Sequence, residues 1–135
     1  MRPLRLKARV RPRDTLRGSK AAPNRAELDK LCRTVVFYRD GGACRKCGKT
    51  TGQLHWAHIY SRRFLSVRWN ELNSMVLCAG CHLFCHHNPI EGGEFFKAEL
   101  GEQIYNGLRT LRNAGLAPNR MAIKLHLTKL LGDSW

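Results

Sequence analysis

Four of the six cysteines occur in two pairs with the same spacing, Cys44-Arg-Lys-Cys47 and Cys78-Ala-Gly-Cys81. In each pair a single turn brings both sulfur atoms to the same side, so the four thiolates could meet at one tetrahedral Zn²⁺ ion. Six cysteines could instead form three disulfides in an oxidising compartment, but two matched pairs favour a metal. This zinc would be structural, because a closed shell of four sulfurs leaves no position for water or substrate, and it would add folding energy to a small core.

Four histidines near these cysteines could take part in chemistry. Residues 53–64, QLHWAHIYSRRF, hold His55 and His58. His82 directly follows the second cysteine pair, and His86 lies four residues further on. An imidazole can act as a general base near neutral pH or bind a metal ion. His82 and His86 are four residues apart, so on a helix they would share one face and could bind the same ion. Taken singly, a histidine on an apolar strand is more often a core residue.

The charge of the chain indicates a polyanionic partner. Lys and Arg number 24 against 10 acidic residues, which gives a formal net charge of +14 and a pI near 10.3. Residues 1–25 hold basic side chains and several prolines against a single acid, Asp14, and cannot bury enough apolar surface to order themselves. We expect a flexible basic arm that contacts DNA phosphates through Arg9, Arg11 and Arg13. The alternative is a solubilising tail.

The sequence contains no run of about 18 apolar residues that would cross a membrane. The basic N-terminus is followed by no apolar segment, so it does not resemble a secretory signal. We therefore expect an intracellular, cytoplasmic protein.

The elements that would position these residues follow from local patterns. A helix is expected after an Asn24 N-cap, with apolar residues at helical spacing and a stop at Gly41-Gly42. Residues 53–60 have strand character, with residues 67–69 as the hairpin partner, and a short helix begins near Cys78. One amphipathic helix is predicted over residues 91–115 and another over 118–132.

We expect one domain over residues 26–135, with a core at 44–90 and C-terminal helices at 92–135. Cys32 and Cys85 are expected to be buried apolar residues.

The order of residues in WAHIYSR and ELNSMVLCAGCH resembles the HNH, or His-Me finger, endonucleases, in particular the zinc-knuckle proteins of phage, homing and recombination systems. In that family a histidine ends a strand, an asparagine precedes the Cys-x-x-Cys-His sequence, and the final histidine opens a helix. The resemblance covers roughly residues 44–90. It implies an α+β fold with a small zinc-stabilised ββα-metal core flanked by helices.

The same resemblance implies roles for individual residues. His58 matches the general base, Asn73 matches the residue that holds the histidine-bearing loop by hydrogen bonds, and His82 matches a ligand of the catalytic ion, for instance Mg²⁺ or Mn²⁺. His86 could bind the same ion. Many family members carry an aspartate ligand where this chain has Ala57. His55 is the candidate to replace this ligand, although strand alternation places it on the opposite face from His58 unless the strand bulges. His87 and Glu71 are weaker candidates.

Three arginines, Arg62, Arg63 and Arg68, flank the predicted catalytic strand. Guanidinium groups suit phosphate geometry, although a solvated turn is an equal alternative for each of them. Trp56 and Trp69 are expected to be core aromatics.

The sequence thus predicts a metal-dependent endonuclease that hydrolyses DNA. The alternative, favoured by Ala57, is a non-catalytic zinc-containing DNA-binding, recombination or packaging accessory protein. A zinc-stabilised protein-interaction module is a third possibility, which the high positive charge disfavours. The oligomeric state and the choice among duplex, branched and single-stranded substrates stay open.

Overall fold

The computed structural model describes residues 21–134, and the predicted basic arm with Arg9, Arg11 and Arg13 lies almost entirely outside them. The described elements are α2 (Arg25–Arg39), β1 (Leu54–His58), α3 (Leu65–Arg68), the 3₁₀ helix η1 (Glu71–Asn73), β2 (Ser74–Cys78), α4 (Ala79–His87), α5 (Pro89–Leu100), α6 (Glu102–Ala114) and α7 (Arg120–Ser134). The protein therefore has an α+β fold with one small two-stranded sheet.

Helix α2 begins and ends where the sequence indicates. The Asn24 side chain accepts a hydrogen bond from the Glu27 N–H at 2.8 Å, which satisfies one of the free donors of the first turn. Gly41 and Gly42, both with positive φ, follow the helix. Its buried face, which includes Leu28, Cys32, Val35 and Val36, packs against the sheet and against α7.

The two strands pair antiparallel, from Leu54 opposite Cys78 to His58 opposite Ser74. The prediction that residues 67–69 pair with β1 is wrong. Leu65–Arg68 forms helix α3, and the strand that pairs with β1 is Ser74–Cys78. Every residue of β2 is buried, so the apolar run from Met75 to Cys78 shows no alternation of the kind that marks a half-exposed strand. Val67 and Trp69 are buried by packing of the α3 turn instead of by strand pairing.

The prediction of one long helix over residues 91–115 is also wrong in one respect, because this segment forms two helices, α5 and α6. Gly101 separates α5 from α6 with φ 90° and ψ 149°, a conformation that glycine adopts without steric cost and that ends a helix. The break lets the two helices bury different residues. Phe96 of α5 packs beneath the sheet, whereas Leu108 of α6 packs against Tyr60 and Val67.

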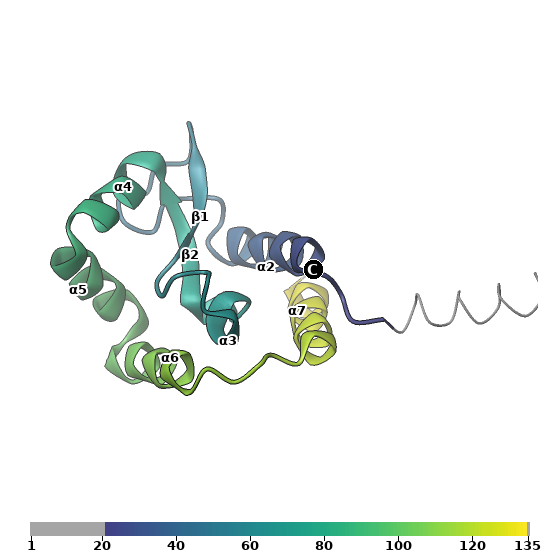
Figure 1. Ribbon diagram of the computed structural model, residues 1–135. Helices are drawn as coiled ribbons and strands as arrows, with labels where there is room; N and C mark the ends of the chain where they lie inside the picture. The colour runs from purple at the N-terminus through teal and green to yellow at the C-terminus, as the bar shows by residue number, and fades with distance from the viewer. Residues whose placement is uncertain (1–20, 135) are drawn as a thin grey trace, which may run out of the picture.

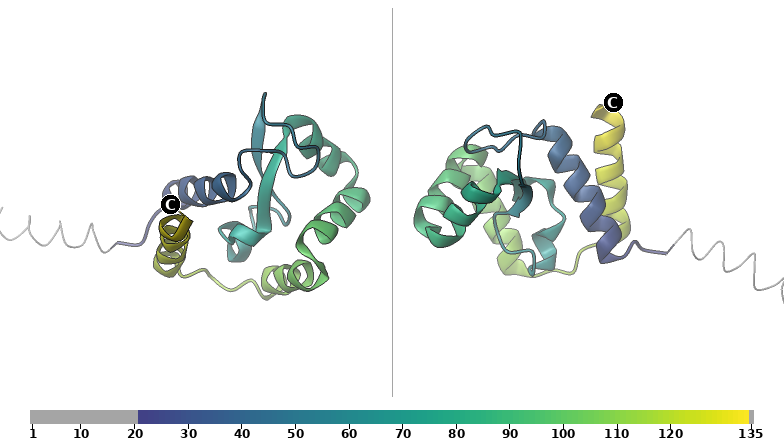
Figure 2. Two further views of the ribbon diagram at one scale, coloured as in Figure 1. Left: turned by 180° about the vertical axis from the view of Figure 1, so that it is seen from behind. Right: turned by 90° about the horizontal axis from the view of Figure 1, so that it is seen from above.

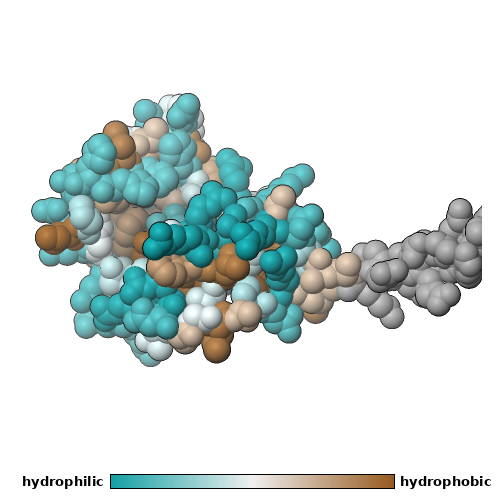
Figure 3. Space-filling model, in the orientation of Figure 1, coloured by the Kyte–Doolittle hydropathy of each residue, from teal (hydrophilic) through white to brown (hydrophobic). Residues whose placement is uncertain are grey.

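Figures 1 and 2 show how these elements surround the hairpin. Helices α4 and α2 lie on different sides of the two strands, α5 and α6 continue the chain around the molecule, and α7 returns beside α2. On the face seen in Figure 3, apolar side chains form separate patches on a mostly hydrophilic surface. Among the described helices, none is both long and apolar enough to span a membrane.

The buried residues form three clusters. One joins α2, α7 and the sheet, a second lies between the sheet, α4 and α5, and a third lies under the loop after β1. Cys32 and Cys85 are buried in the first and second clusters, as predicted. Trp69 belongs to the first cluster, and Trp56 packs against it while staying partly exposed.

Candidate functional site

The four paired cysteines come together at one point of the fold. Their sulfur atoms all lie within 4.8 Å of one another, and the sulfurs of Cys47 and Cys78 are 3.7 Å apart. A tetrahedral zinc with bonds of about 2.3 Å places its sulfur ligands about 3.8 Å apart. Cys44, Cys47, Cys78 and Cys81 could therefore hold a metal ion, and the arrangement is compatible with a structural zinc.

Backbone N–H groups favour the thiolate form that a metal requires. The Cys47 N–H lies 3.5 Å from the Cys44 sulfur, and the Cys81 N–H lies 3.4 Å from the Cys78 sulfur. Burial would raise the pKa of the Cys44 thiol, but backbone N–H groups of Cys47, Cys78 and Lys46 lower its pKa to about 6. Gly48, with φ 82°, closes the first turn by donating its N–H to the Cys44 carbonyl at 2.8 Å. The cysteine turns are thus preformed for metal binding.

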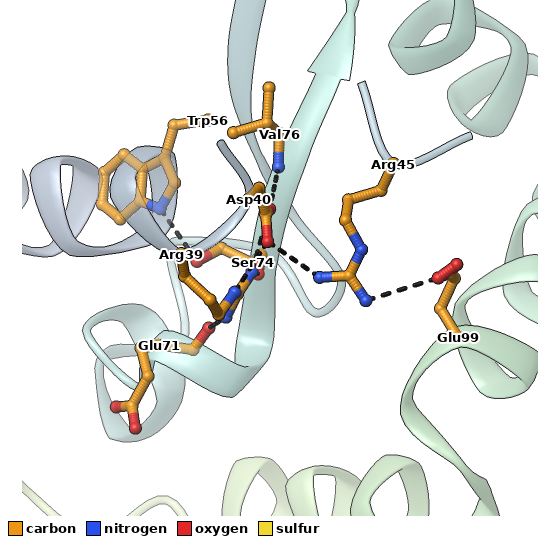
Figure 4. A network of polar contacts seen from close by, with 8 residues as sticks. All are labelled: Arg39, Asp40, Arg45, Trp56, Glu71, Ser74, Val76 and Glu99. Carbon is orange, nitrogen blue, oxygen red and sulfur yellow. Dashed lines mark hydrogen bonds and ion pairs between the residues drawn. The ribbon is translucent and has the colours of Figure 1, made fainter. Parts of the chain in front are cut away.

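A buried carboxylate anchors the first cysteine turn to the rest of the protein (Figure 4). Asp40, whose side chain is 1% exposed, accepts hydrogen bonds from Arg39, from Arg45 at 2.9 Å and from the Val76 N–H at 2.9 Å. Arg45 lies between Cys44 and Cys47 and also pairs with Glu99 of α5 at 3.3 Å. This network ties the cysteine turn to α2, β2 and α5.

Three histidines form a row beside the sheet. His55 of β1 lies 2.9 Å from His82 of α4, between their Nδ1 atoms, and His82 lies 3.2 Å from His86, between their Nε2 atoms. His82 is central and faces its two neighbours with different ring nitrogens. Burial lowers the pKa of His82, with further contributions from His86 and His55, so this imidazole is neutral, the form that binds metal ions. The row therefore provides nitrogen ligands on α4 and β1.

His58 lies on the other face of β1. The pairing of β1 with β2 is regular over all five residues, without a bulge, so side chains three residues apart point to opposite faces. The ring of His58 contacts the Trp56 ring, with centroids 4.2 Å apart. Among the described contacts, His55 and His86 touch His82, and His58 does not.

The hydrogen bond of His58 defines its tautomer. Its Nε2 atom lies 3.0 Å from the backbone carbonyl oxygen of Arg68. A carbonyl oxygen only accepts, so Nε2 carries the hydrogen and Nδ1 keeps a lone pair. Burial lowers the pKa of His58 to about 4, so the ring is neutral and basic at Nδ1 near neutral pH.

Asn73 fixes the loop that follows His58. Its side-chain oxygen accepts from the Tyr60 N–H at 2.9 Å, and its amide nitrogen donates to the carbonyls of Tyr60 at 3.0 Å and Val67 at 3.1 Å. The side chain is fully buried. These hydrogen bonds hold the segment between β1 and α3 in one conformation.

The three arginines near this loop have different environments. Arg68 is 11% exposed and binds Asp29 of α2 through two nitrogens, at 3.0 Å and 2.6 Å. Arg62 is 57% exposed and lies 3.2 Å from the same carboxylate. Arg63 is exposed, with its guanidinium over the Phe64 ring. Arg62 and Arg63 are thus accessible to a ligand, whereas the Arg68 side chain links the α3 turn to Asp29 of α2.

Asp29 is a residue that the sequence did not single out. It also accepts a hydrogen bond from the Trp69 indole at 2.8 Å. Burial would raise the pKa of this carboxyl, but the hydrogen bonds from Arg68 and Trp69 hold its pKa below the ordinary value. Asp29 is one of two acids on a mostly basic helix, and no local pattern reveals its role.

The structure gives Ala57 and the weaker candidates, Glu71 and His87, other surroundings. Ala57 is fully buried between the sheet and α4, among residues that include Met75 and Leu77. Glu71 pairs with His126 of α7 at 3.1 Å, and His87 is exposed at the end of α4. His55 is therefore the side chain from β1 that reaches the ligands of α4.

Comparisons with protein-family models, curated proteins and solved structures give no match for this chain.

Proposed function

We propose that this protein is a metal-dependent endonuclease of the HNH type that hydrolyses phosphodiester bonds in DNA. The proposal rests on the hydrogen bonds that Asn73 and His58 make with the loop after β1 and with α3. Asn73 holds the segment from Tyr60 to Val67, and the next residue, Arg68, holds the neutral ring of His58. His58 ends β1, Asn73 ends η1 directly before β2, and His82 lies in helix α4, in the order that the family resemblance implies.

In this proposal His58 is the general base. Its Nδ1 atom accepts a proton from water as the water oxygen attacks phosphorus, while the Arg68 carbonyl keeps the ring oriented through Nε2. The leaving group is the 3′ oxygen of the nucleotide, so the product carries a 5′ phosphate. The low pKa of His58 leaves the ring unprotonated at neutral pH, with a lone pair on Nδ1, and also makes the ring a weaker base than a free imidazole.

The histidine row would hold the catalytic cation. His82 and His86, with His55, offer nitrogen ligands only, and such a set suits transition metals better than Mg²⁺, which prefers oxygen. When bound, a divalent cation supplies positive charge that stabilises the phosphate and the leaving oxygen. The four cysteines would hold a separate structural zinc.

A second function is favoured by two specific observations. Ala57 provides no ligand, and His58 lies on the opposite face of β1 from His55. A zinc-containing DNA-binding protein that assists phage recombination or packaging would keep the cysteine site and the positive charge without needing a base beside the histidine row.

Plasmid nicking separates the two functions. Supercoiled DNA is incubated with wild-type protein, His58→Ala and the control His87→Ala, each with Mg²⁺, Mn²⁺ or Ni²⁺. We expect wild type and the control to nick the plasmid, and His58→Ala to be slower by about 10²–10⁴-fold, the usual contribution of a general base. DNA binding by the wild type without nicking in any of these ions would reject the nuclease and favour the accessory protein.

A further inference from the structure

A hollow of about 470 Å³ lies where α2, β1 and α4 meet. Its wall includes Lys30 and Arg33 from α2 and Arg62 from the loop after β1. His55 and His82, two members of the histidine row, line the same hollow. Three basic side chains therefore surround a space that borders the candidate metal ligands.

The α2 cations are available to a ligand. Lys30 and Arg33 are three residues apart on the helix, and both side chains are exposed. Within residues 21–134 neither forms an ion pair with a carboxylate; the Arg33 guanidinium lies over the Phe37 ring, 4.2 Å from its centroid. Within residues 21–134, an anion that entered the hollow would meet these cations without displacing a carboxylate.

The acid in the wall does not cancel this charge. Asp29 also lines the hollow, but its carboxylate is occupied by Arg68 and by the Trp69 indole. Arg62 lies at the edge of the same carboxylate and remains largely exposed. The wall therefore keeps a net positive charge from Lys30, Arg33 and Arg62 after Asp29 is paired with Arg68.

We infer that this hollow binds a backbone phosphate of DNA and that α2 forms part of the substrate surface. The choice of DNA rests on the proposed function. A phosphate held by Lys30, Arg33 and Arg62 would lie beside His55 and His82, on the side from which a cation on these histidines could be reached. Lys30 and Arg33 lie outside residues 44–90, so neither the cysteine pairs nor the histidine spacing indicates them.

The test compares two double variants with the same net charge, +12. Lys30→Gln/Arg33→Gln removes the α2 cations of the hollow, and Lys97→Gln/Lys129→Gln removes two exposed cations of α5 and α7 that do not line it. All four side chains are exposed, so both variants should fold. Binding of a fluorescent 20-base-pair DNA duplex to the full chain is followed by anisotropy over a range of salt concentrations, with no added Mg²⁺ or Mn²⁺.

We expect the α2 variant to bind at least about fivefold more weakly than the control variant. Its plot of log affinity against log salt should be less steep by about 1, since the hollow holds one phosphate and each lost phosphate contact contributes about 0.9. Equal affinity and equal slope for the two variants would overturn the inference. If the α2 variant is selectively weakened but wild type never cleaves, the phosphate site stands and the nuclease proposal fails. If wild type cleaves and the two variants bind alike, the phosphate site alone is rejected.

Discussion

The Nε2 atom of His58 lies 3.0 Å from the carbonyl oxygen of Arg68. The side chain of Arg68 binds Asp29 of α2 through two hydrogen bonds, at 3.0 Å and 2.6 Å. A carboxylate on the first described helix thus fixes the residue whose backbone orients the imidazole at the end of β1. Residues far apart in the sequence define the environment of His58.

The Asp29→Ala variant should lose about 2–4 kcal/mol of unfolding free energy, because it leaves the mostly buried Arg68 guanidinium and the Trp69 indole without their acceptor. The control is Glu27→Ala on the same helix, which removes an exposed pair with Lys124 and should cost under about 1 kcal/mol. Urea unfolding measures both. Equal losses would show that the Asp29 contacts contribute no more than a surface pair.

The Asn73→Asp variant tests the loop contacts without changing side-chain volume. It should destabilise the protein by about 2–4 kcal/mol, because the donors to the Tyr60 and Val67 carbonyls are replaced by a buried carboxylate oxygen. Asn70→Asp is the matched control, since the Asn70 side chain accepts from the Leu72 N–H and an aspartate accepts equally well. Thermal unfolding should separate the two variants clearly. A stable Asn73→Asp protein would contradict the assigned hydrogen bonds.

Protonation of His58 should make the protein less stable in acid. The pKa of His58 is about 4 in the folded protein and near 6.5 in the unfolded chain, so between these values the unfolded state binds more protons. The contribution of His58 to the free energy of unfolding is therefore complete above pH 6.5. It is lost as pH falls toward 4, by roughly 3 kcal/mol in total.

The measurement is the unfolding free energy of wild type and His58→Gln at several pH values from 7 to 4.5. Glutamine can still donate to the Arg68 carbonyl but does not titrate, so its curve should be less steep. His87→Gln, at an exposed position, should follow the wild type. Parallel curves for wild type and His58→Gln would mean that His58 is not held neutral by burial.

The cysteine site should bind one zinc ion per chain, measured by elemental analysis of the purified protein. Structural zinc contributes on the order of 10 kcal/mol of apparent free energy, comparable with the total stability of a domain, so its removal should unfold the protein. Cys47→Ser should lose the zinc, whereas Cys32→Ala, which changes a buried cysteine outside the cluster, should keep it. Retention of native circular dichroism after chelation would exclude a structural role for this metal.

Local features of the chain could be predicted because neighbouring residues determine them. The Asn24 cap and Gly41-Gly42 delimit α2, and the spacing of each cysteine pair defines a turn that points two sulfurs the same way. The strand at Leu54–His58 and the helix after Cys78 were predicted for the same reason. Gly101 was a visible signal for a helix break, but the apolar spacing continued through it and the break was missed.

Two features depended on contacts between distant residues. The partner of β1 was mistaken because the fully buried strand β2 shows no alternation, and pairing is decided by what covers each face. Arg68 was expected at phosphate, yet it binds Asp29, since a carboxylate 39 positions away supplies the acceptor.

The sequence by itself determined the metal-type cysteine cluster, the α+β composition and the strong positive charge, because residue type and short spacing suffice for these. Only the tertiary structure decided that β1 has no bulge, that His55 reaches His82, and that Lys30 and Arg33 of α2 border the same hollow as the histidines. The physical reason is that side-chain direction along a strand or helix is a local property, whereas the partner that each side chain meets depends on how the elements pack.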